Sequence, residues 1–263
     1  YTPPTGYVSL CTQNLSDPTI ADGSTAMDAK LWTGSGSSQT ITYPFALDFA
    51  WIKSRNQAYH HILLDTVRGD NKVLLSDQTN AELNNPSFAG GQFSGNDLVL
   101  PGKQNVNQGS NTYVGWAWDG GTSTVSNTDG SITSNVRANA SAGFSVVTAS
   151  PTNAYTNYTF GHGLNATPEF IIGKNRAQAS QWDVYHQDVG TGKLFRLNQT
   201  SAVSTATANQ DSYYPTAPTN SVFGFVANGA TNNYVWYCFA PVAGYSAFGS
   251  YTANASTDGP FVF

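Results

Sequence analysis

Charged side chains are scarce in this chain. Only 10% of its 263 residues are Asp, Glu, Lys or Arg, against roughly 25% in an average soluble domain. The 11 basic residues lie singly along the sequence and the formal net charge is −5. Nucleic-acid-binding proteins need a basic stripe to replace counterions, so we expect no nucleic-acid partner. A surface of hydroxyl and amide groups is typical of extracellular proteins and fibres, and low charge density favours self-association.

Cysteine and long apolar runs are also scarce. Cys11 and Cys238 are the two cysteines, and their wide separation gives no spacing signal. A disulfide between them and two unpaired, partly buried thiols both stay open. No stretch approaches the roughly 20 apolar residues of a membrane helix, so we expect no membrane insertion. The chain starts at Tyr1 without a signal segment, which is consistent with a mature product or with a piece of something longer.

Patterns for catalysis and metal binding are missing as well. His60 and His61 are adjacent, so on a strand they face opposite sides, which is a poor arrangement for a shared metal ion. His162 lies between two glycines, as in a turn, and Glu82 and Glu169 are the only glutamates. The sequence contains neither a Gly-x-Ser-x-Gly motif nor an Asp-x-Asp-x-Asp spacing. We therefore expect no enzymatic activity, no cofactor and no metal site.

What the sequence does contain is a repeat. Three separate blocks match at one common offset of 121 residues, which is hard to produce by chance. The sequence therefore predicts an internal duplication. The matching blocks are 49–55 with 170–176, 72–79 with 193–200, and 111–118 with 232–239.

Each repeat consists of short apolar runs. Runs of four to eight residues rich in Val, Ile, Thr and aromatics, bounded by Gly, Pro, Asn and Ser, are typical of strands. Many short strands with frequent turns are typical of sandwiches and barrels. We therefore predict an all-β fold of two tandem, internally duplicated domains that are β-sandwich-like, or jelly-roll-like. The predicted parts are an extended N-terminal arm at 1–29, a first β repeat at 30–142, a second at 143–247, and the start of a third at 248–263.

One strand indicates how a repeat packs. From Tyr234 to Phe239 both alternating sets of side chains are apolar, so we expect both faces of this strand to be covered. One cover is the core of its own repeat. The other is either the sister repeat or another protein chain.

The end of the chain looks like a strand without a sheet. Residues 248–254 are similar to 144–149, and an apolar run follows at 260–263. A strand without partners cannot satisfy its own backbone, so either the gene product continues or this strand completes a sheet in another subunit. In the second case the subunit contacts are Phe248, Tyr251, Phe261, Val262 and Phe263.

Sugar-related features are of two kinds. Exposed tryptophans stack on sugars, and Trp32 and Trp182 are our choice of exposed residues among tryptophans that otherwise fall on predicted core strands. Asn-x-Ser/Thr sequons permit N-glycosylation where the secretory machinery exists, although many arise from composition alone in a chain this rich in Asn, Ser and Thr. The sequons are at Asn14, Asn139, Asn157, Asn165, Asn198 and Asn254.

Several strings together resemble a known family. They are PTGY (4–7), NL (14–15), DPTI (17–20), DGS (22–24), DTVRG (65–69), NTDGSI (127–132), GHGL (161–164), FGSYT (248–252) and DGPF (258–261). Over nearly its whole length the chain resembles a β-rich domain of unknown function. That domain is repeated in tail-fibre and other virion-associated proteins of aquatic bacteriophages, and in related bacterial and environmental proteins. The resemblance implies fibre or surface material and brings no catalytic residues. In relatives the segment at 248–261 continues into further repeat sequence, whereas here it stops.

These observations lead to one expected function and one alternative. We expect an extracellular or virion-surface structural subunit that assembles with itself, head to tail, into a fibre or filament, or forms part of a phage-like tail fibre. Strand addition between subunits would join the copies. The alternative is a carbohydrate-binding or cell-surface-binding module, whose partners would be cell-surface glycans.

Overall fold

The computed structural model describes residues 17–85, 89–229 and 233–259. The elements whose bounds are given within these ranges are strands and a short 3-10 helix at Gly23–Thr25, joined by turns and loops. The prediction of an all-β fold is confirmed, with several antiparallel sheets. Runs of β-branched and aromatic residues separated by Gly, Pro and Asn turns give short strands rather than helices.

The strands follow one another with short connections. In the first half they are β1 (Met27–Thr33), β2 (Gln39–Thr42), β3 (Phe49–Ser54), β4 (Ile62–Asp65), β5 (Lys72–Leu75), β6 (Leu83–Asn84), β7 (Gln92–Ser94), β8 (Asp97–Leu100) and β9 (Thr112–Trp118). In the second half they are β10 (Thr124–Asn127), β11 (Ser134–Asn139), β12 (Phe144–Ala149), β13 (Asn157–Gly161), β14 (Phe170–Asn175), β15 (Trp182–His186), β16 (Lys193–Leu194), β17 (Ser204–Thr205), β18 (Val222–Val226) and β19 (Tyr234–Phe239).

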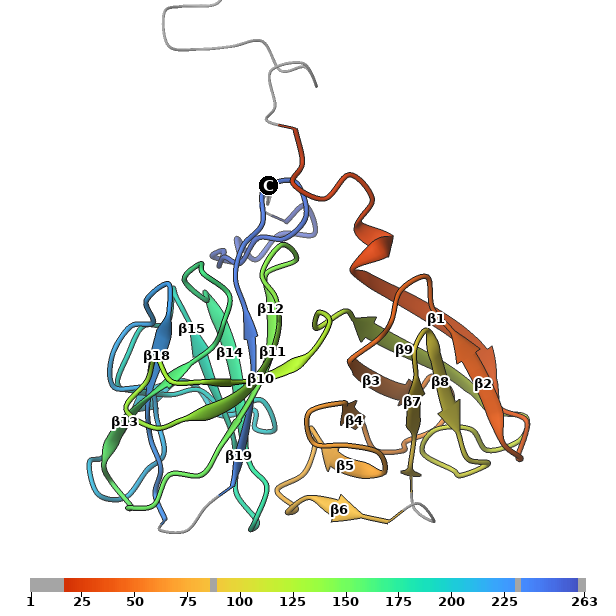
Figure 1. Cartoon of the computed structure of the whole chain (residues 1–263), viewed down its shortest axis with the longest axis horizontal. Coiled ribbons are helices and arrows are strands. Elements are labelled where there is room, and N and C mark those ends of the chain that lie inside the picture. Colours follow the sequence, from red (N-terminus) through yellow and green to blue (C-terminus); the bar gives the residue numbers. More distant parts are fainter. Residues whose placement is uncertain (1–16, 86–88, 230–232, 260–263) are drawn as a thin grey trace, which may run out of the picture.

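Two large sheets organise the molecule. Sheet I has the strand order β1-β9-β3-β4-β5-β6, and sheet II has the order β10-β11-β12-β19-β14-β15. Smaller sheets, β2-β8-β7 and β13-β18, lie on the outer sides of sheet I and sheet II (Figure 1). By hydrogen bonding, sheet II begins at Thr124 rather than at the predicted boundary of 143, because β11 pairs with β12. Sheet I begins at Met27, inside the predicted N-terminal arm.

The central strands of the two sheets pair in matching registers. In sheet I, Phe49 lies opposite Trp118 of β9 and Asp65 of β4. In sheet II, Phe170 lies opposite Phe239 of β19 and His186 of β15. Each residue of the second set is 121 positions after its counterpart, which is the offset of the sequence blocks.

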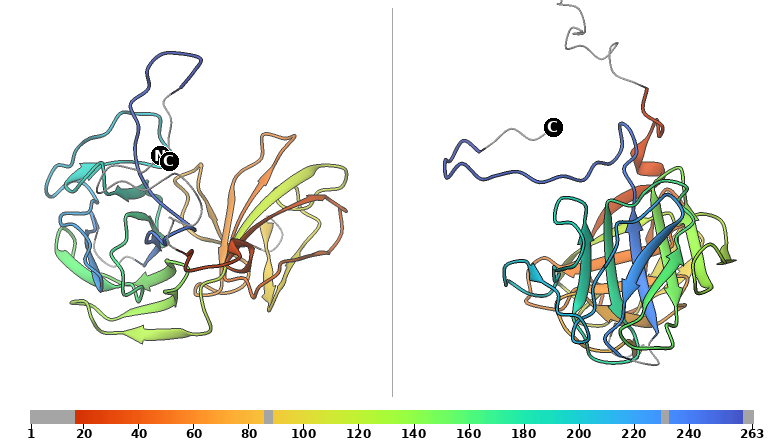
Figure 2. Two further views of the ribbon diagram at one scale, coloured as in Figure 1. Left: turned by 90° about the horizontal axis from the view of Figure 1, so that it is seen from above. Right: turned by 90° about the vertical axis from the view of Figure 1, so that its left-hand side faces the viewer.

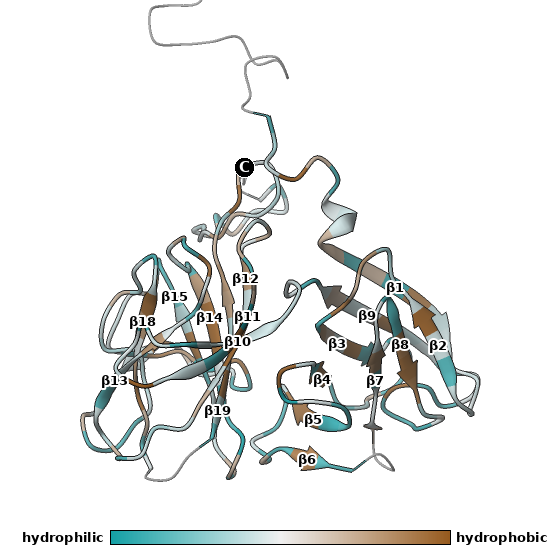
Figure 3. Ribbon diagram, in the orientation of Figure 1, coloured by the Kyte–Doolittle hydropathy of each residue, from teal (hydrophilic) through white to brown (hydrophobic). Residues whose placement is uncertain are grey.

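Three apolar layers hold the sheets together. One lies between sheet I and β2-β8-β7, one between sheets I and II, and one between sheet II and β13-β18. Alternation along β19 explains the arrangement, because Tyr234 and Trp236 enter the outer layer while Val235 and Tyr237 enter the layer between the sheets. Both faces of this strand are therefore covered, and the second cover is sheet I of the same chain (Figure 3).

Candidate functional site

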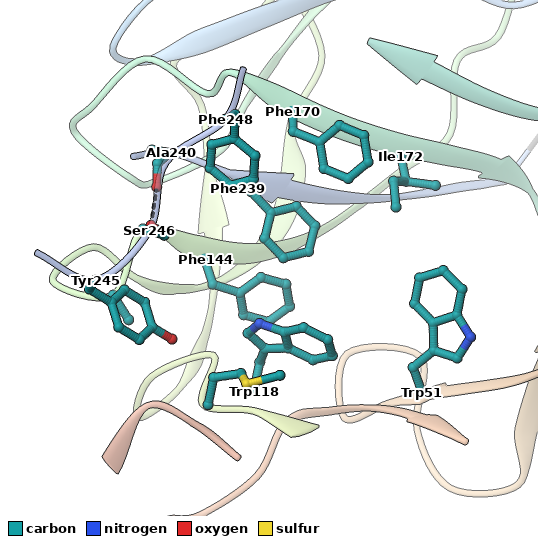
Figure 4. Close-up of a pocket in the computed structure, with 13 residues that line it drawn as sticks. Trp51, Trp118, Phe144, Phe170, Ile172, Phe239, Ala240, Tyr245, Ser246 and Phe248 are labelled. Atoms are coloured by element: carbon teal, nitrogen blue, oxygen red, sulfur yellow. Dashed lines mark hydrogen bonds between the residues drawn. The ribbon is translucent and has the colours of Figure 1, made fainter. Parts of the chain in front are cut away.

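An open apolar pocket lies between sheets I and II, on the side where the C-terminal segment leaves the body (Figure 4). Its volume is about 370 Å³. The pocket combines residues of β1, β3, β9, β12, β14 and β19 with the turn after β19. Its lining residues are Met27, Trp51, Trp118, Ala142, Gly143, Phe144, Phe170, Ile172, Phe239, Ala240, Tyr245, Ser246 and Phe248.

Aromatic rings from neighbouring strands form the pocket wall. Antiparallel pairing places Phe144, Phe170 and Phe239 side by side, because β19 lies between β12 and β14. Ring centroids are 5.1 Å apart for Phe144 and Phe239 and 5.7 Å apart for Phe170 and Phe239. Phe248 continues this row, with its ring stacked on Phe170 at 6.0 Å. The last ring of the row thus belongs to the C-terminal segment.

The turn after β19 closes one side of the pocket. The Val242 amide donates to the Ser246 carbonyl at 3.0 Å, and the Ser246 hydroxyl donates to the Ala240 carbonyl at 3.4 Å. Burial, together with the nearby Asp119 carboxylate, raises the pKa of Tyr245. The lining offers little that could transfer a proton near neutral pH, and it suits an apolar side chain.

A buried polar cluster joins the two halves elsewhere in the interface. Asp65 accepts hydrogen bonds from Arg68 Nε at 2.5 Å and from the Tyr237 hydroxyl at 2.8 Å. Arg68 also pairs with Glu82 at 3.1 Å, and Glu82 in turn accepts from Arg176 Nε at 2.8 Å and Nη2 at 3.0 Å. The side chains of Asp65 and Arg68 have no solvent exposure. This cluster fixes strands of the first half to strands of the second.

The charges of this cluster support one another. Burial alone would lower the pKa of Arg68, but the neighbouring Asp65, Tyr237 and Glu82 raise it above its ordinary value. Burial likewise opposes ionisation of Glu82, but its hydrogen bonds and its pairing with the two arginines lower the Glu82 pKa. Such shifts are what a structural ion-pair network produces.

A second, polar pocket of about 490 Å³ is lined by residues of the second half together with Thr79 of the first half. Amides, hydroxyls and one ion pair line it. Arg196 pairs with Asp183 and lies 3.9 Å from an oxygen of Asp211, and burial lowers the Arg196 pKa. The lining residues are Thr79, Gln178, Ala179, Ser180, Gln181, Asp183, Arg196, Ser212 and Asn228. These groups can bind a neutral, hydroxyl-rich molecule.

The two tryptophans predicted to be exposed are buried, so that prediction is wrong. Trp32 is 8% exposed, stacks on Tyr113 at 5.6 Å and donates to the Val106 carbonyl at 3.1 Å. Trp182 has no exposed surface and donates to the Leu75 carbonyl at 2.8 Å, across the interface between the halves. Each indole is enclosed because its strand packs against a second layer, so neither can stack on a glycan.

The predicted subunit-contact residues have different environments. Phe248 is half-buried against Phe170 and Phe239. Tyr251 is 67% exposed, and residues 249–259 are exposed and form no strand. Figure 2 shows this segment running away from the sheets. The remaining predicted contacts, Phe261, Val262 and Phe263, lie outside the described residues.

The sequons and cysteines differ in accessibility. Asn157, Asn165 and Asn254 are exposed, whereas the side-chain amides of Asn139 and Asn198 donate to Asp119 and Gln181. Cys238 is buried in the outer layer of the second half, and burial raises its pKa. Asn14 and Cys11 lie outside the described residues.

The histidines occupy structural positions. His60 Nδ1 lies 2.7 Å from Asp77, and His61 accepts a hydrogen bond from the Trp51 indole at 3.1 Å. His162 is buried beside the Thr219 carbonyl, and burial lowers its pKa. Within the described ranges, no three His, Cys, Asp or Glu side chains gather where they could hold a metal ion. In the same part of the chain, no helix has the length and apolar character needed to cross a membrane.

Sequence reasoning missed the pocket and the polar cluster. The string DTVRG, which contains Asp65 and Arg68, contributed to the family resemblance, but its charges gave no sign of a partner far along the chain. Tyr237 is 172 positions from Asp65. Such a contact depends on how the two sheets stack, which local patterns do not encode.

Comparison with known proteins gives one assignment. Residues 22–263 match a family model described as a domain of unknown function, DUF7483. No curated protein and no solved structure matches the chain. Because the match covers most of the 263 residues, the chain belongs to the DUF7483 family.

Proposed function

We propose that the chain consists of two tandem copies of one β-sandwich-like unit. The matching registers of β3, β4 and β9 with β14, β15 and β19 support this. A lysine in each copy supports it further. Lys53 Nζ donates to the carbonyls of Ser54 and Gln57 at 2.7 and 2.9 Å, and Lys174 Nζ donates to those of Asn175 and Gln178 at 2.7 and 3.5 Å.

We further propose that the chain is an extracellular structural subunit that assembles head to tail into a fibre, or into part of a phage-like tail fibre. The observation that carries this proposal is the C-terminal segment. It is anchored by Phe248 and then exposes residues 249–259 without a strand partner. A segment of this kind is suited to strand addition in another subunit. A head-to-tail contact that does not close generates a filament.

The composition favours a structural role over catalysis. A surface with few charges has little electrostatic repulsion between identical copies. The pocket between sheets I and II is lined mainly by aromatic rings and aliphatic groups. His61 accepts a hydrogen bond from the Trp51 indole, and His162 lies beside the Thr219 carbonyl. We therefore propose that the protein is not an enzyme.

Deletion of residues 249–263 tests the assembly. This truncation keeps Phe248 in its contact with Phe170, so the body should stay folded, with unchanged thermal unfolding. We expect the full chain to form large, growing assemblies in sedimentation velocity and the truncated chain to remain monomeric. Assembly that persists unchanged in the truncated chain would rule out strand donation by this segment.

Carbohydrate binding is a second candidate function, and the polar pocket favours it. Gln178, Gln181 and Asn228 bring amide groups to a cavity beside the Arg196–Asp183 pair, and amides are common partners of sugar hydroxyls. Glycan-array binding that is lost in Asn228→Ala and retained in Trp32→Phe would favour this function. A folded chain that binds no glycan on the array would contradict it.

A further inference from the structure

Equivalent strands of the two sheets have different outer neighbours. β1 in sheet I occupies the position that β12 occupies in sheet II. Leu31 of β1 lies opposite Val114 of β9, and Thr148 of β12 lies opposite Val235 of β19. Val235 is the residue 121 positions after Val114. On its other side β12 pairs with β11, and Thr148 lies opposite Asn135. Within the described residues, β1 is the last strand of sheet I and no strand pairs with its outer side.

The free side of β1 can be identified from its hydrogen bonds. Near the two ends of the strand, Gly34 donates to Asn111 at 2.8 Å and Ala26 accepts from Asp119 at 2.9 Å. Alternation in an antiparallel ladder then directs the backbone groups of the odd-numbered residues, including Leu31 and Thr33, away from β9. The same alternation in β12 directs Thr148 toward β11.

Only one end of this edge is protected. The Asp28 carboxylate accepts the outward amide of Ala29 at 2.8 Å and pairs with Lys30 at 2.7 Å. Charged and self-capped residues of this kind discourage strand addition. At the other end, Leu31 is 64% exposed. An exposed apolar side chain beside open backbone groups is the usual signature of a strand-pairing site.

The C-terminal segment has the complementary properties. Tyr251 is 67% exposed and lies in an exposed stretch without a strand partner. Its flanking residues, Ser250 and Thr252, and the similarity of 248–254 to β12 suit a strand. Tyr251 and Leu31 are the most exposed of the large hydrophobic side chains in the described chain. Mutual burial of these two side chains would favour association.

We propose that the outer edge of β1 at Leu31–Thr33 accepts the C-terminal segment of a second copy of this chain, around Tyr251, in the place that β11 occupies beside β12. This proposal rests on the fibre function and names its acceptor surface. The added strand continues sheet I by one strand, so sheet I of one subunit receives the tail of the next.

Photo-cross-linking of the full chain tests the contact directly. A photoreactive phenylalanine analogue replaces Tyr251, and this chain is mixed with an equal amount of ¹⁵N-labelled wild-type chain. Mass spectrometry should then find cross-links from position 251 to the β1 peptide of the labelled copy. Cross-links to another strand, cross-links within one chain only, or no cross-links would each overturn the proposal.

Two matched substitutions on the acceptor sharpen this test. Leu31→Lys charges the proposed edge, whereas Val125→Lys makes the same change at a 53% exposed residue of β10, the outer strand of sheet II. We expect at least a tenfold loss of cross-link yield with Leu31→Lys and less than a twofold change with Val125→Lys. Equal effects of the two substitutions would contradict the assignment of the edge.

The outcomes also separate this proposal from the fibre function. Filaments whose cross-links from position 251 map away from β1 would leave the fibre function standing and overturn the acceptor. Cross-links to β1 in a preparation that stops at two subunits would support the acceptor and overturn open-ended assembly.

Discussion

The two halves of the molecule share their central strands and differ at their borders. β3 and β9 pair like β14 and β19, residue for residue. At the border, the β10–β11 hairpin continues sheet II beyond β12, while β1 is the last strand of sheet I among the described residues. The register of pairing inside a sheet is fixed by alternating apolar residues. The strands at the edge of a sheet have a neighbour on one side only, so a strand can be added there. The edges are therefore the places where two similar halves can take different roles.

The layer between the sheets shows a second difference. Asp65 and Glu82 belong to the buried polar cluster, but the residues 121 positions later are the half-buried His186 and the exposed Val203. In the described part of the second half, the matching positions therefore form no such cluster, and the cluster connects the two halves. Substitutions at paired positions should then have unequal effects.

The largest inequality is expected at Asp65 and His186. Asp65→Ala leaves the buried Arg68 with less compensation and removes the acceptor of Tyr237, so we expect a loss of about 3–5 kcal/mol in the free energy of unfolding. His186→Ala should cost less than about 1 kcal/mol because its side chain is partly solvated. Urea denaturation measures both. Similar losses at the two positions would contradict a cluster specific to the interface.

A smaller inequality is expected at Phe49 and Phe170. Phe49 is 1% exposed and its ring centroid lies 4.4 Å from that of Tyr237, so Phe49→Ala should leave a cavity and cost about 3–4 kcal/mol. Phe170 borders the existing pocket, and Phe170→Ala should cost about 2 kcal/mol because part of its ring already faces open space. Thermal unfolding of the two variants checks the order, and a costlier Phe170→Ala would reverse it.

A difference that appears only with pH is expected at Lys174, which is fully buried while its counterpart Lys53 is half-buried. Burial lowers the pKa of Lys174 to about 8 from 10.5. Between these values the unfolded chain binds more protons, so this lysine's contribution to stability rises with pH over that window and is lost as the pH falls toward 8. We expect wild type to gain roughly 2–3 kcal/mol relative to Lys174→Met from pH 8 to 10.5. Urea denaturation at each pH measures this difference. If the free energies of unfolding of wild type and Lys174→Met change in parallel over this pH range, the expectation is wrong.

The sequence predicted the centres of the sheets better than their surroundings. Strands at 49–54, 112–118, 170–175 and 234–239 follow from apolar runs and a common offset, and the covered faces of β19 follow from its two apolar sets. The burial of Trp32 and Trp182 could not be predicted from the sequence. Alternation shows which side chains share a face of a strand, but it does not show which layer packs on that face. The Asp65–Tyr237 contact was beyond local patterns for the same reason.

Electron microscopy of the purified full chain, at neutral pH and moderate salt, tests the central claim most directly. We expect filaments with a regular repeat of one subunit, in which density for an added strand lies along β1. Dispersed monomers at all concentrations would contradict head-to-tail assembly.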